Sequence, residues 1–369
     1  MPIMKYYFLV VISGYYKVTP ISVISRFQLY VKLMSIDIIV DFRYLIFKVL
    51  SLRDAIFRFS AGDNIMKPRR GTLSVPGHIE KMHVKASQQQ VDVVMLDLED
   101  SVPFEAKASA RNRIVHSIQE LDWRNTTVTI RINGLDTPFG YRDLLEVVEA
   151  AGPKIDSVVV PKVNHSKDIH FVSRMLDGIE AAKGFPNRIN IEAIIESAEG
   201  LEQVTRIAKA SDRLITLVFG IVDYSASIGA RLISISGHGE KEEEIYPGHR
   251  WNFEMSRIVM AAKAHGLLAI DAPYGNFKDP QGLQRSTAVS CALGYDGKWA
   301  IHPEQIDIIQ HAFSPSAEDI ERAAKVLAAH KEAREKGLGA VAVEGRMVDQ
   351  ATVRLAKQLY EQAKYLNMV

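Results

Sequence analysis

The chain has 369 residues, of which 47% are hydrophobic, and this is enough for one large buried core. Its formal net charge of +1 gives no electrostatic support for nucleic-acid binding. The one cysteine, Cys291, excludes an intramolecular disulfide and a cysteine-based zinc cluster, and we expect a reducing, cytoplasmic setting.

Residues 1–65 differ in composition from the rest of the chain. They are crowded with Ile, Val, Phe and Tyr, and their charges are mostly basic. Neither of the apolar patches, 6–16 and 35–50, offers the ~18 uninterrupted apolar residues that a membrane-spanning helix needs. We therefore interpret 1–65 as an appended segment of uncertain structure, with Met66 as the natural start. A membrane-surface anchor is the alternative.

From Met66 to residue 314, apolar strand-like runs alternate with helical patterns. The expected strands are 71–76, 91–99, 126–133, 155–162, 189–196, 214–220, 267–273 and 298–303. Alternation of this kind favours a parallel sheet with helical crossovers, and eight units favour a closed (β/α)8 TIM barrel. No Gly-x-Gly-x-x-Gly pattern follows the first strand, so a dinucleotide site has no support.

The tail after the barrel is predicted to be helical. A helix is expected over 317–337 and another over 351–367, joined by a polar loop at 338–350. We interpret 315–369 as a C-terminal helical lid over the mouth of the catalytic barrel formed by 66–314.

Two carboxylates, Glu196 and Asp223, follow apolar runs and should project from the carboxyl-terminal rim of the barrel. Hard oxygen ligands suit Mg2+, which takes one or two protein carboxylates and keeps positions for water and substrate oxygens. Mn2+ would serve in the same way. The alternative is that each carboxylate caps the helix that follows it.

Arg131 lies inside an apolar strand-like run, where a guanidinium is costly unless it meets an anion. We interpret it as a donor to a substrate oxygen that becomes negative during the reaction. Glu99 and Asp100, at the end of the preceding strand, are expected to orient Arg131. The alternative is a purely structural ion pair between Arg131 and one of these two carboxylates.

Two further residues keep both a structural and a functional interpretation. His302 follows the last strand and is either a core histidine or a substrate contact. Lys81, near the first strand, is either a solvated surface charge or a contact for a phosphorylated ligand.

An ordered set of short motifs resembles the citrate-lyase β-subunit/HpcH–HpaI aldolase superfamily, and within it the malyl-CoA, β-methylmalyl-CoA and citramalyl-CoA lyases. The resemblance runs from about Lys67 to the C-terminus. The motifs are LSVPG, EKM, LDLEDSV, RINGLDTPF, VVVPK, IIESAEG, GIVDYSAS, KWAIHPEQ and GRMVD.

This resemblance implies roles for individual residues. Glu196 and Asp223 would hold Mg2+, and Arg131 would bind the substrate beside it. Asp349 would be the catalytic acid and base, carried by the lid over a neighbouring subunit's barrel. The residues assigned to CoA-thioester and substrate binding are Ser74, Lys81, Val222, Asp223, Ile301 and His302.

The implied function is Mg2+-dependent, reversible cleavage of a 3-hydroxyacyl-CoA to acetyl-CoA or propionyl-CoA and a 2-oxo acid, glyoxylate or pyruvate. A lid that serves a neighbour implies a homo-oligomer, a trimer or hexamer by resemblance. The alternatives are a malyl-CoA thioesterase or malate-synthase-like hydrolase, an aldolase acting on pyruvate-type substrates, and a non-catalytic acyl-CoA-binding protein.

Overall fold

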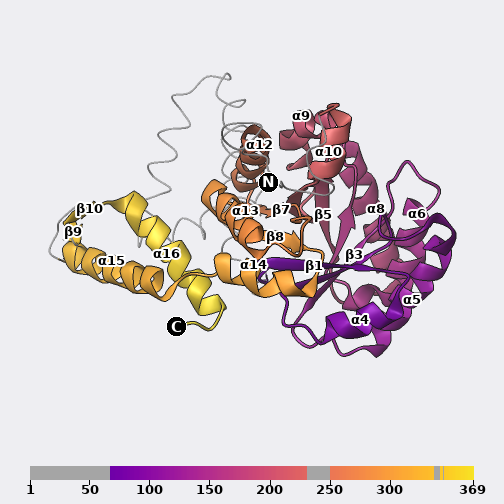
Figure 1. Cartoon of the computed structure of the whole chain (residues 1–369), viewed down its shortest axis with the longest axis horizontal. Helices are drawn as coiled ribbons and strands as arrows, with labels where there is room; N and C mark the ends of the chain where they lie inside the picture. Colours follow the sequence, from indigo (N-terminus) through magenta and orange to yellow (C-terminus); the bar gives the residue numbers. More distant parts are fainter. Residues whose placement is uncertain (1–66, 231–249, 336–340, 344) are drawn as a thin grey trace, which may run out of the picture. The chain divides into compact units, whose positions relative to one another are not determined.

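A computed structural model of the chain describes residues 67–230, 250–335, 341–343 and 345–369 (Figure 1). Residues 1–65, for which an appended segment was predicted, lie outside the described residues. None of the described helices is long and apolar enough to cross a lipid bilayer.

Eight parallel strands close into a barrel in sequence order, with β1 paired to both β2 and β8. The predicted (β/α)8 architecture is therefore confirmed. The strands are β1 Gly71–Pro76, β2 Val93–Asp97, β3 Thr127–Arg131, β4 Ser157–Val160, β5 Asn190–Ile195, β6 Leu214–Phe219, β7 Leu268–Asp271 and β8 Gly297–Ala300.

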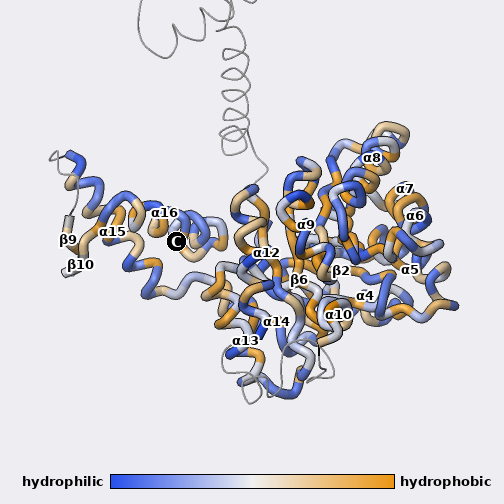
Figure 2. The backbone as a smooth tube through the Cα atoms, turned by 90° about the horizontal axis from the view of Figure 1, so that it is seen from above, coloured by the Kyte–Doolittle hydropathy of each residue, from blue (hydrophilic) through white to orange (hydrophobic). Residues whose placement is uncertain are grey.

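Helices follow the strands and pack around the sheet. They are α4 Glu80–Ser87, η1 Phe104–Ala106, α5 Lys107–Glu120, α6 Gly140–Asp143, η2 Leu144–Val148, α7 Glu149–Ala151, η3 Gly152–Lys154, α8 Ser166–Lys183, α9 Ala198–Ile207, α10 Ile221–Ser227, α12 Asn252–Ala264, α13 Pro280–Leu293, η4 Pro303–Gln305 and α14 Ile306–Ala312. Figure 2 shows hydrophobic and hydrophilic residues interspersed along these helices, as expected when one face is buried.

Two apolar clusters make up the barrel's core. The larger cluster lies between the strands and the surrounding helices, which explains the near-continuous apolar runs of the strands. The smaller one consists of Met95, Val159, Ile194, Val218, Ile270 and Trp299. All six of these residues come from strands, and they alternate with residues of the larger cluster, so they fill the inside of the barrel.

Buried charges below this inner cluster are paired. Arg69, which precedes β1, donates to Glu192 of β5 at 2.5 Å, and the Ser157 hydroxyl donates to the same carboxylate at 2.6 Å. Arg69 and Glu192 are both almost fully buried. Side chains thus fill the interior of the barrel. A functional site is therefore expected at the carboxyl-terminal end of the strands.

The last predicted strand was placed too far along the chain. β8 ends at Ala300, because the Ile301 N–H donates to the Gln305 side chain and His302 accepts from the Glu304 N–H. These contacts turn the backbone out of the ladder before Pro303, which has no N–H to offer.

The tail contains the predicted pair of helices, α15 Ala317–Glu335 and α16 Gln350–Tyr365. The prediction of a simple polar loop between them was wrong in part. Strands β9 Val341–Val343 and β10 Arg346–Val348 form an antiparallel hairpin there, and Gly345 supplies the positive φ of 76° at its turn.

Candidate active site

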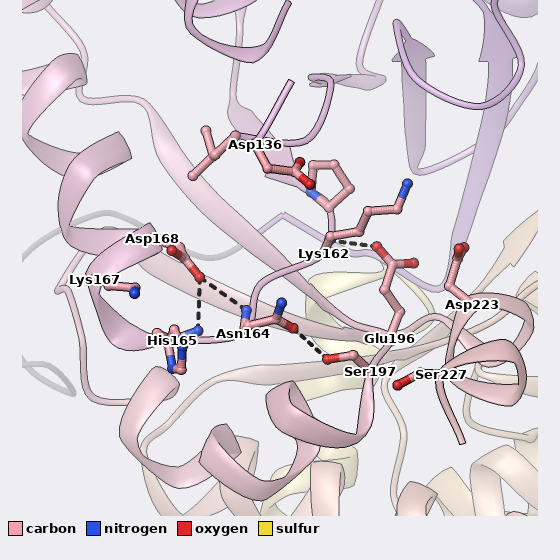
Figure 3. Close-up of a pocket in the computed structure, with 12 residues that line it drawn as sticks. Asp136, Lys162, Asn164, His165, Lys167, Asp168, Glu196, Ser197, Asp223 and Ser227 are labelled. Atoms are coloured by element: carbon pink, nitrogen blue, oxygen red, sulfur yellow. Dashed lines mark hydrogen bonds between the residues drawn. The ribbon is translucent and has the colours of Figure 1, made fainter. Parts of the chain in front are cut away.

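The polar residues of interest lie at the carboxyl ends of β2, β3, β5 and β6, where a (β/α)8 barrel carries its chemistry. Glu196 follows β5 directly, and Asp223 sits in the first turn of α10, just after β6. Both line one pocket of about 440 Å³, which Figure 3 shows. Residues of the loops after β3 and β4 complete its wall.

Neither carboxylate caps a helix, which was the alternative interpretation. Ser197, rather than Glu196, caps α9 by accepting from the Gly200 N–H at 2.9 Å. α10 begins after Gly220 and has no side-chain cap. Both carboxylates are therefore left to face the pocket.

Glu196 is held by its surroundings. Its Oε1 accepts from the Lys162 backbone N–H at 2.6 Å. A Cβ atom at Gly220 would lie 2.4 Å from Glu196 Oε2, so glycine is required there for the side chain to fit. In Figure 3 the Glu196 carboxylate lies between the Lys162 backbone and Asp223.

Arg131 is buried and engaged mainly by a residue that the sequence analysis did not single out, Asp97. Its Nε and Nη2 donate to the two Asp97 carboxylate oxygens at 2.6 and 2.7 Å. The third nitrogen, Nη1, lies 3.0 Å from Glu99 and 3.7 Å from Asp100. The guanidinium also stacks over the Trp299 ring, 5.7 Å from its centroid.

Asp97 also fixes the loop that carries Glu99. Its two oxygens accept from the Glu99 N–H, at 2.9 Å, and from the backbone and hydroxyl of Ser101, at 3.1 and 2.5 Å. Burial would raise the pKa of Asp97, but the charge and hydrogen bonds of Arg131 outweigh burial and hold the pKa below its usual range. Asp97 therefore remains ionised and keeps Arg131 in place.

Lys162 is the second residue that sequence reasoning missed. It follows β4 in the left-handed region with φ of 54°, its ammonium lies 2.9 Å from Glu99 Oε1, and it lines the pocket. The same attention to charged residues at strand ends would have found both. Lys162 ends the run 155–162, and Asp97 lies two residues after the inward-facing Met95, so its side chain is on the same side of the strand.

The pocket carboxylates resist ionisation. Burial raises the pKa of Glu196 to about 8, and the charges of Glu99 and Asp223 add to the shift. Burial also raises the pKa of Asp223, with a further contribution from the Asp100 charge, and raises that of Glu99 in spite of Arg131. A bound cation would favour the ionised forms of these carboxylates and so offset the cost of burying their charge.

Several carboxylates gather at the mouth of the barrel, and they differ in what engages them. Asp97 and Glu99 are paired with Arg131, whereas Glu196 and Asp223 face the pocket and offer oxygen atoms to a cation. The described residues hold no cluster of three or more His, Cys, Asp or Glu ligands. Two carboxylates with free ligand positions suit Mg2+.

The remaining predicted binding residues are not among those that line the pocket. Ser74 is half-buried in β1, Lys81 is exposed on α4, and Val222 is 49% exposed on α10. Ile301 is 41% exposed after β8. The His302 ring stacks on Phe277 with ring centroids 4.9 Å apart. Its side chain is partly exposed, so it is a surface-accessible histidine rather than a core one.

Asp349 is exposed and caps α16. Its Oδ1 accepts from the Ala351 and Thr352 N–H groups at 3.0 and 2.9 Å and from the Thr352 hydroxyl at 3.0 Å. These bonds, those of Thr352 first, lower the pKa of Asp349. The structure does not place this carboxylate in the pocket wall.

Comparison with known proteins agrees with this geometry. Residues 70–303 match the HpcH/HpaI aldolase/citrate lyase family. A Rhodobacter capsulatus protein named L-malyl-CoA/beta-methylmalyl-CoA lyase is 40% identical over 294 residues, 78% of this chain and 92% of the relative. A Cereibacter sphaeroides protein of the same name is 38% identical over 306 residues, 82% of this chain and 96% of the relative.

Among solved structures, the CitE protein of Mycobacterium tuberculosis in complex with magnesium, acetoacetate and coenzyme A superposes with a TM-score of 0.64 and 29% identity. The match covers 81% of this chain and 99% of that one. With the closed barrel and its acidic mouth, these matches show that the chain belongs to the HpcH/HpaI aldolase/citrate lyase family.

Proposed function

We propose that this carbon–carbon lyase is a Mg2+-dependent CoA-ester lyase that reversibly cleaves L-malyl-CoA or β-methylmalyl-CoA. The products are acetyl-CoA or propionyl-CoA and glyoxylate. The observation that carries the proposal is the convergence of Glu196, Asp223 and the paired Arg131 on one mouth of the barrel. The names of the relatives and the magnesium and coenzyme A in the CitE structure support it.

Glu196 and Asp223 would hold Mg2+, which supplies Lewis-acid stabilisation of the oxygen that becomes the carbonyl of the oxo acid. The chain's own residues set up this arrangement before the substrate binds. The Lys162 N–H and the space at Gly220 fix the direction of the Glu196 carboxylate. Mn2+ would use the same oxygen ligands.

In cleavage the hydroxyl loses its proton to water, its oxygen becomes the carbonyl oxygen of the oxo acid, and the bond between the hydroxyl-bearing carbon and the carbon next to the thioester breaks, leaving an enolate. In our proposal, Arg131 stabilises the enolate oxygen through Nη1, while Asp97 holds the other two nitrogens. The guanidinium remains protonated because the charges of Asp97 and Glu99 outweigh burial and raise its pKa. A preorganised donor of this kind lowers the barrier because it stabilises negative charge that develops in the transition state.

Asp349 is the proposed acid that protonates the enolate carbon, and in condensation it is the base that removes the same proton. The hydrogen bonds at the start of α16 make it a weak base. For catalysis the carboxylate must leave these donors and enter a site from which water is excluded, where its pKa rises. A lid that serves a neighbouring barrel in a trimer or hexamer would supply that site.

A substrate panel tests the proposal. The full chain is incubated with Mg2+ and with malyl-, β-methylmalyl- or citramalyl-CoA, and glyoxylate, pyruvate, acyl-CoA and free CoA are measured. We expect glyoxylate together with acetyl-CoA or propionyl-CoA, and loss of turnover in EDTA and in Glu196→Gln. Free CoA with no acyl-CoA would instead identify a thioesterase, and no product from any substrate would contradict catalysis.

A further inference from the structure

The distribution of positive charge around the pocket is uneven. Arg131 commits Nε and Nη2 to Asp97, and its Nη1 lies beside Glu99. Lys107 points its ammonium at the carbonyls of Leu98 and Glu99, at 3.0 Å each. Lys107 is therefore occupied by backbone carbonyls, and Arg131 keeps only Nη1, beside Glu99, for a substrate oxygen.

Lys162 differs from both. Its side chain is 42% exposed, and it lines the pocket together with Glu196 and Asp223. Its ammonium forms an ion pair with Glu99, and Figure 3 shows its side chain beside the Glu196 carboxylate. Burial would lower its pKa, but the bond to Glu99 and the charges of Glu99, Asp100 and Asp223 raise it instead. Lys162 is therefore a permanent cation beside the metal-binding carboxylates.

The backbone fixes this position. Lys162 adopts a φ of 54°, which a non-glycine residue rarely does, and its N–H donates to Glu196 Oε1. The same residue thus orients one carboxylate through its backbone and directs its charged end toward another. A placement this constrained indicates a function for the side chain.

We propose that Lys162 is a specificity-determining residue whose ammonium attracts the carboxylate of the 2-oxo acid portion of the substrate and, by the same charge, weakens binding of the divalent cation. The inference rests on the proposed function. In this division of roles, Lys162 recognises the carboxylate of the small oxo acid, and Arg131 stabilises the negative charge of the enolate.

Coulomb's law gives the two effects opposite signs. Removing the ammonium leaves the carboxylates more negative, so a divalent cation binds more tightly. The same removal takes a positive charge from the anion's surroundings, so a carboxylate ligand binds more weakly. A merely structural lesion at Lys162, which would misplace Glu196, weakens binding of both ligands. The pair of measurements therefore separates the two explanations.

The test compares the full chain with Lys162→Met, Lys162→Arg and a matched exposed lysine, Lys209→Met. Mn2+ binding is measured by electron paramagnetic resonance, and glyoxylate and pyruvate binding to the Mn2+-loaded protein by calorimetry. In Lys162→Met we expect Mn2+ to bind about tenfold more tightly and glyoxylate about tenfold more weakly, which is about 1.4 kcal/mol in each direction. Lys162→Arg and Lys209→Met should stay within about twofold of wild type, as expected for charge-conserving or remote changes.

Weaker or unchanged Mn2+ binding in Lys162→Met, or unchanged glyoxylate binding, overturns the proposal. Failure of the function itself looks different. If the unmodified protein and Glu196→Gln bind Mn2+ equally poorly, or if the unmodified protein binds no oxo acid, the metal-dependent lyase assignment fails as well. If the unmodified protein binds both ligands and Lys162→Met changes neither, only the role of Lys162 is lost.

Discussion

Asp97 and Arg131 act as one unit at the mouth of the barrel. The bidentate pair is almost fully buried, and Asp97 also orders the loop that carries Glu99. The guanidinium of a buried strand arginine needs such a partner to fix its position and offset the cost of burial, because isolated buried charges are strongly disfavoured. The position of the proposed enolate-stabilising group is thus decided by a carboxylate on the neighbouring strand.

Asp97→Asn should therefore damage both stability and activity. The variant leaves a buried guanidinium without its ionised partner, and we expect a loss of about 3 kcal/mol in the free energy of unfolding, measured in urea. Misplacement of Arg131 should also lower kcat/KM by about a hundredfold. Asp136→Asn, which alters an exposed carboxylate in the same pocket, is the stability control. Equal unfolding curves for the two variants would contradict a structural role for Asp97.

At the scale of elements, α4 is fastened to the barrel by a buried histidine. The His83 ring lies 2.7 Å from the Ser117 hydroxyl of α5 through Nδ1 and 3.1 Å from the Pro76 carbonyl of β1 through Nε2. A neutral ring with the proton on Nε2 satisfies both contacts, since it donates to the carbonyl and accepts from the hydroxyl. Burial lowers the pKa of His83, although the Pro76 carbonyl and Glu80 oppose the shift.

This lowered pKa predicts a pH dependence of stability. Below the unfolded-state pKa of about 6.5 the unfolded chain takes up a proton at His83 that the folded chain resists. The stabilisation is therefore complete above that pH and is lost as the pH falls toward the folded-state pKa, by up to about 1.4 kcal/mol per pH unit. His83→Gln keeps a donor and an acceptor but does not titrate. Urea unfolding of both proteins at pH 7, 6 and 5 should show the steeper decline for wild type, and parallel declines would refute the assignment.

At the scale of the whole molecule, the C-terminal helices carry the proposed acid and base. α15, the hairpin β9–β10 and α16 have an apolar cluster of their own, formed by Ala323, Val326, Val348 and Ala356. Val348 directly precedes Asp349, so the cluster anchors the proposed acid and base to these C-terminal elements. A unit with its own core can present Asp349 to a barrel as a preformed surface.

A mixing experiment tests whether the lid serves a neighbouring barrel. Asp349→Asn and Glu196→Gln should each be inactive, because one lacks the proton carrier and the other a metal ligand. Co-expressed in equal amounts, they should recover about one quarter of wild-type activity, because a site works only when its barrel comes from Asp349→Asn and its lid from Glu196→Gln. Each variant expressed alone is the control. No recovery in mixed oligomers, with their composition verified by mass spectrometry, would mean that the lid serves its own barrel.

The barrel and much of its rim follow from local patterns in the amino-acid sequence. Apolar runs buried on both faces, separated by helical patterns, are compatible with few folds other than a closed parallel barrel, so eight strands could be predicted with small errors at their ends. Charged residues inside or near the ends of these runs identified Glu196, Asp223 and Arg131, because burial and periodicity are local properties of the chain.

Tertiary structure decided which of the charged groups meet. Asp97 lies 34 residues from Arg131, and Lys162 lies 34 residues from Glu196. These residues meet only because of the register between neighbouring strands and the left-handed backbone at Lys162. A sequence pattern shows that a side chain is polar and lies at a strand end, but the energy of a charge depends on its distance to every other charge and on its burial. Those distances exist only after the barrel has closed.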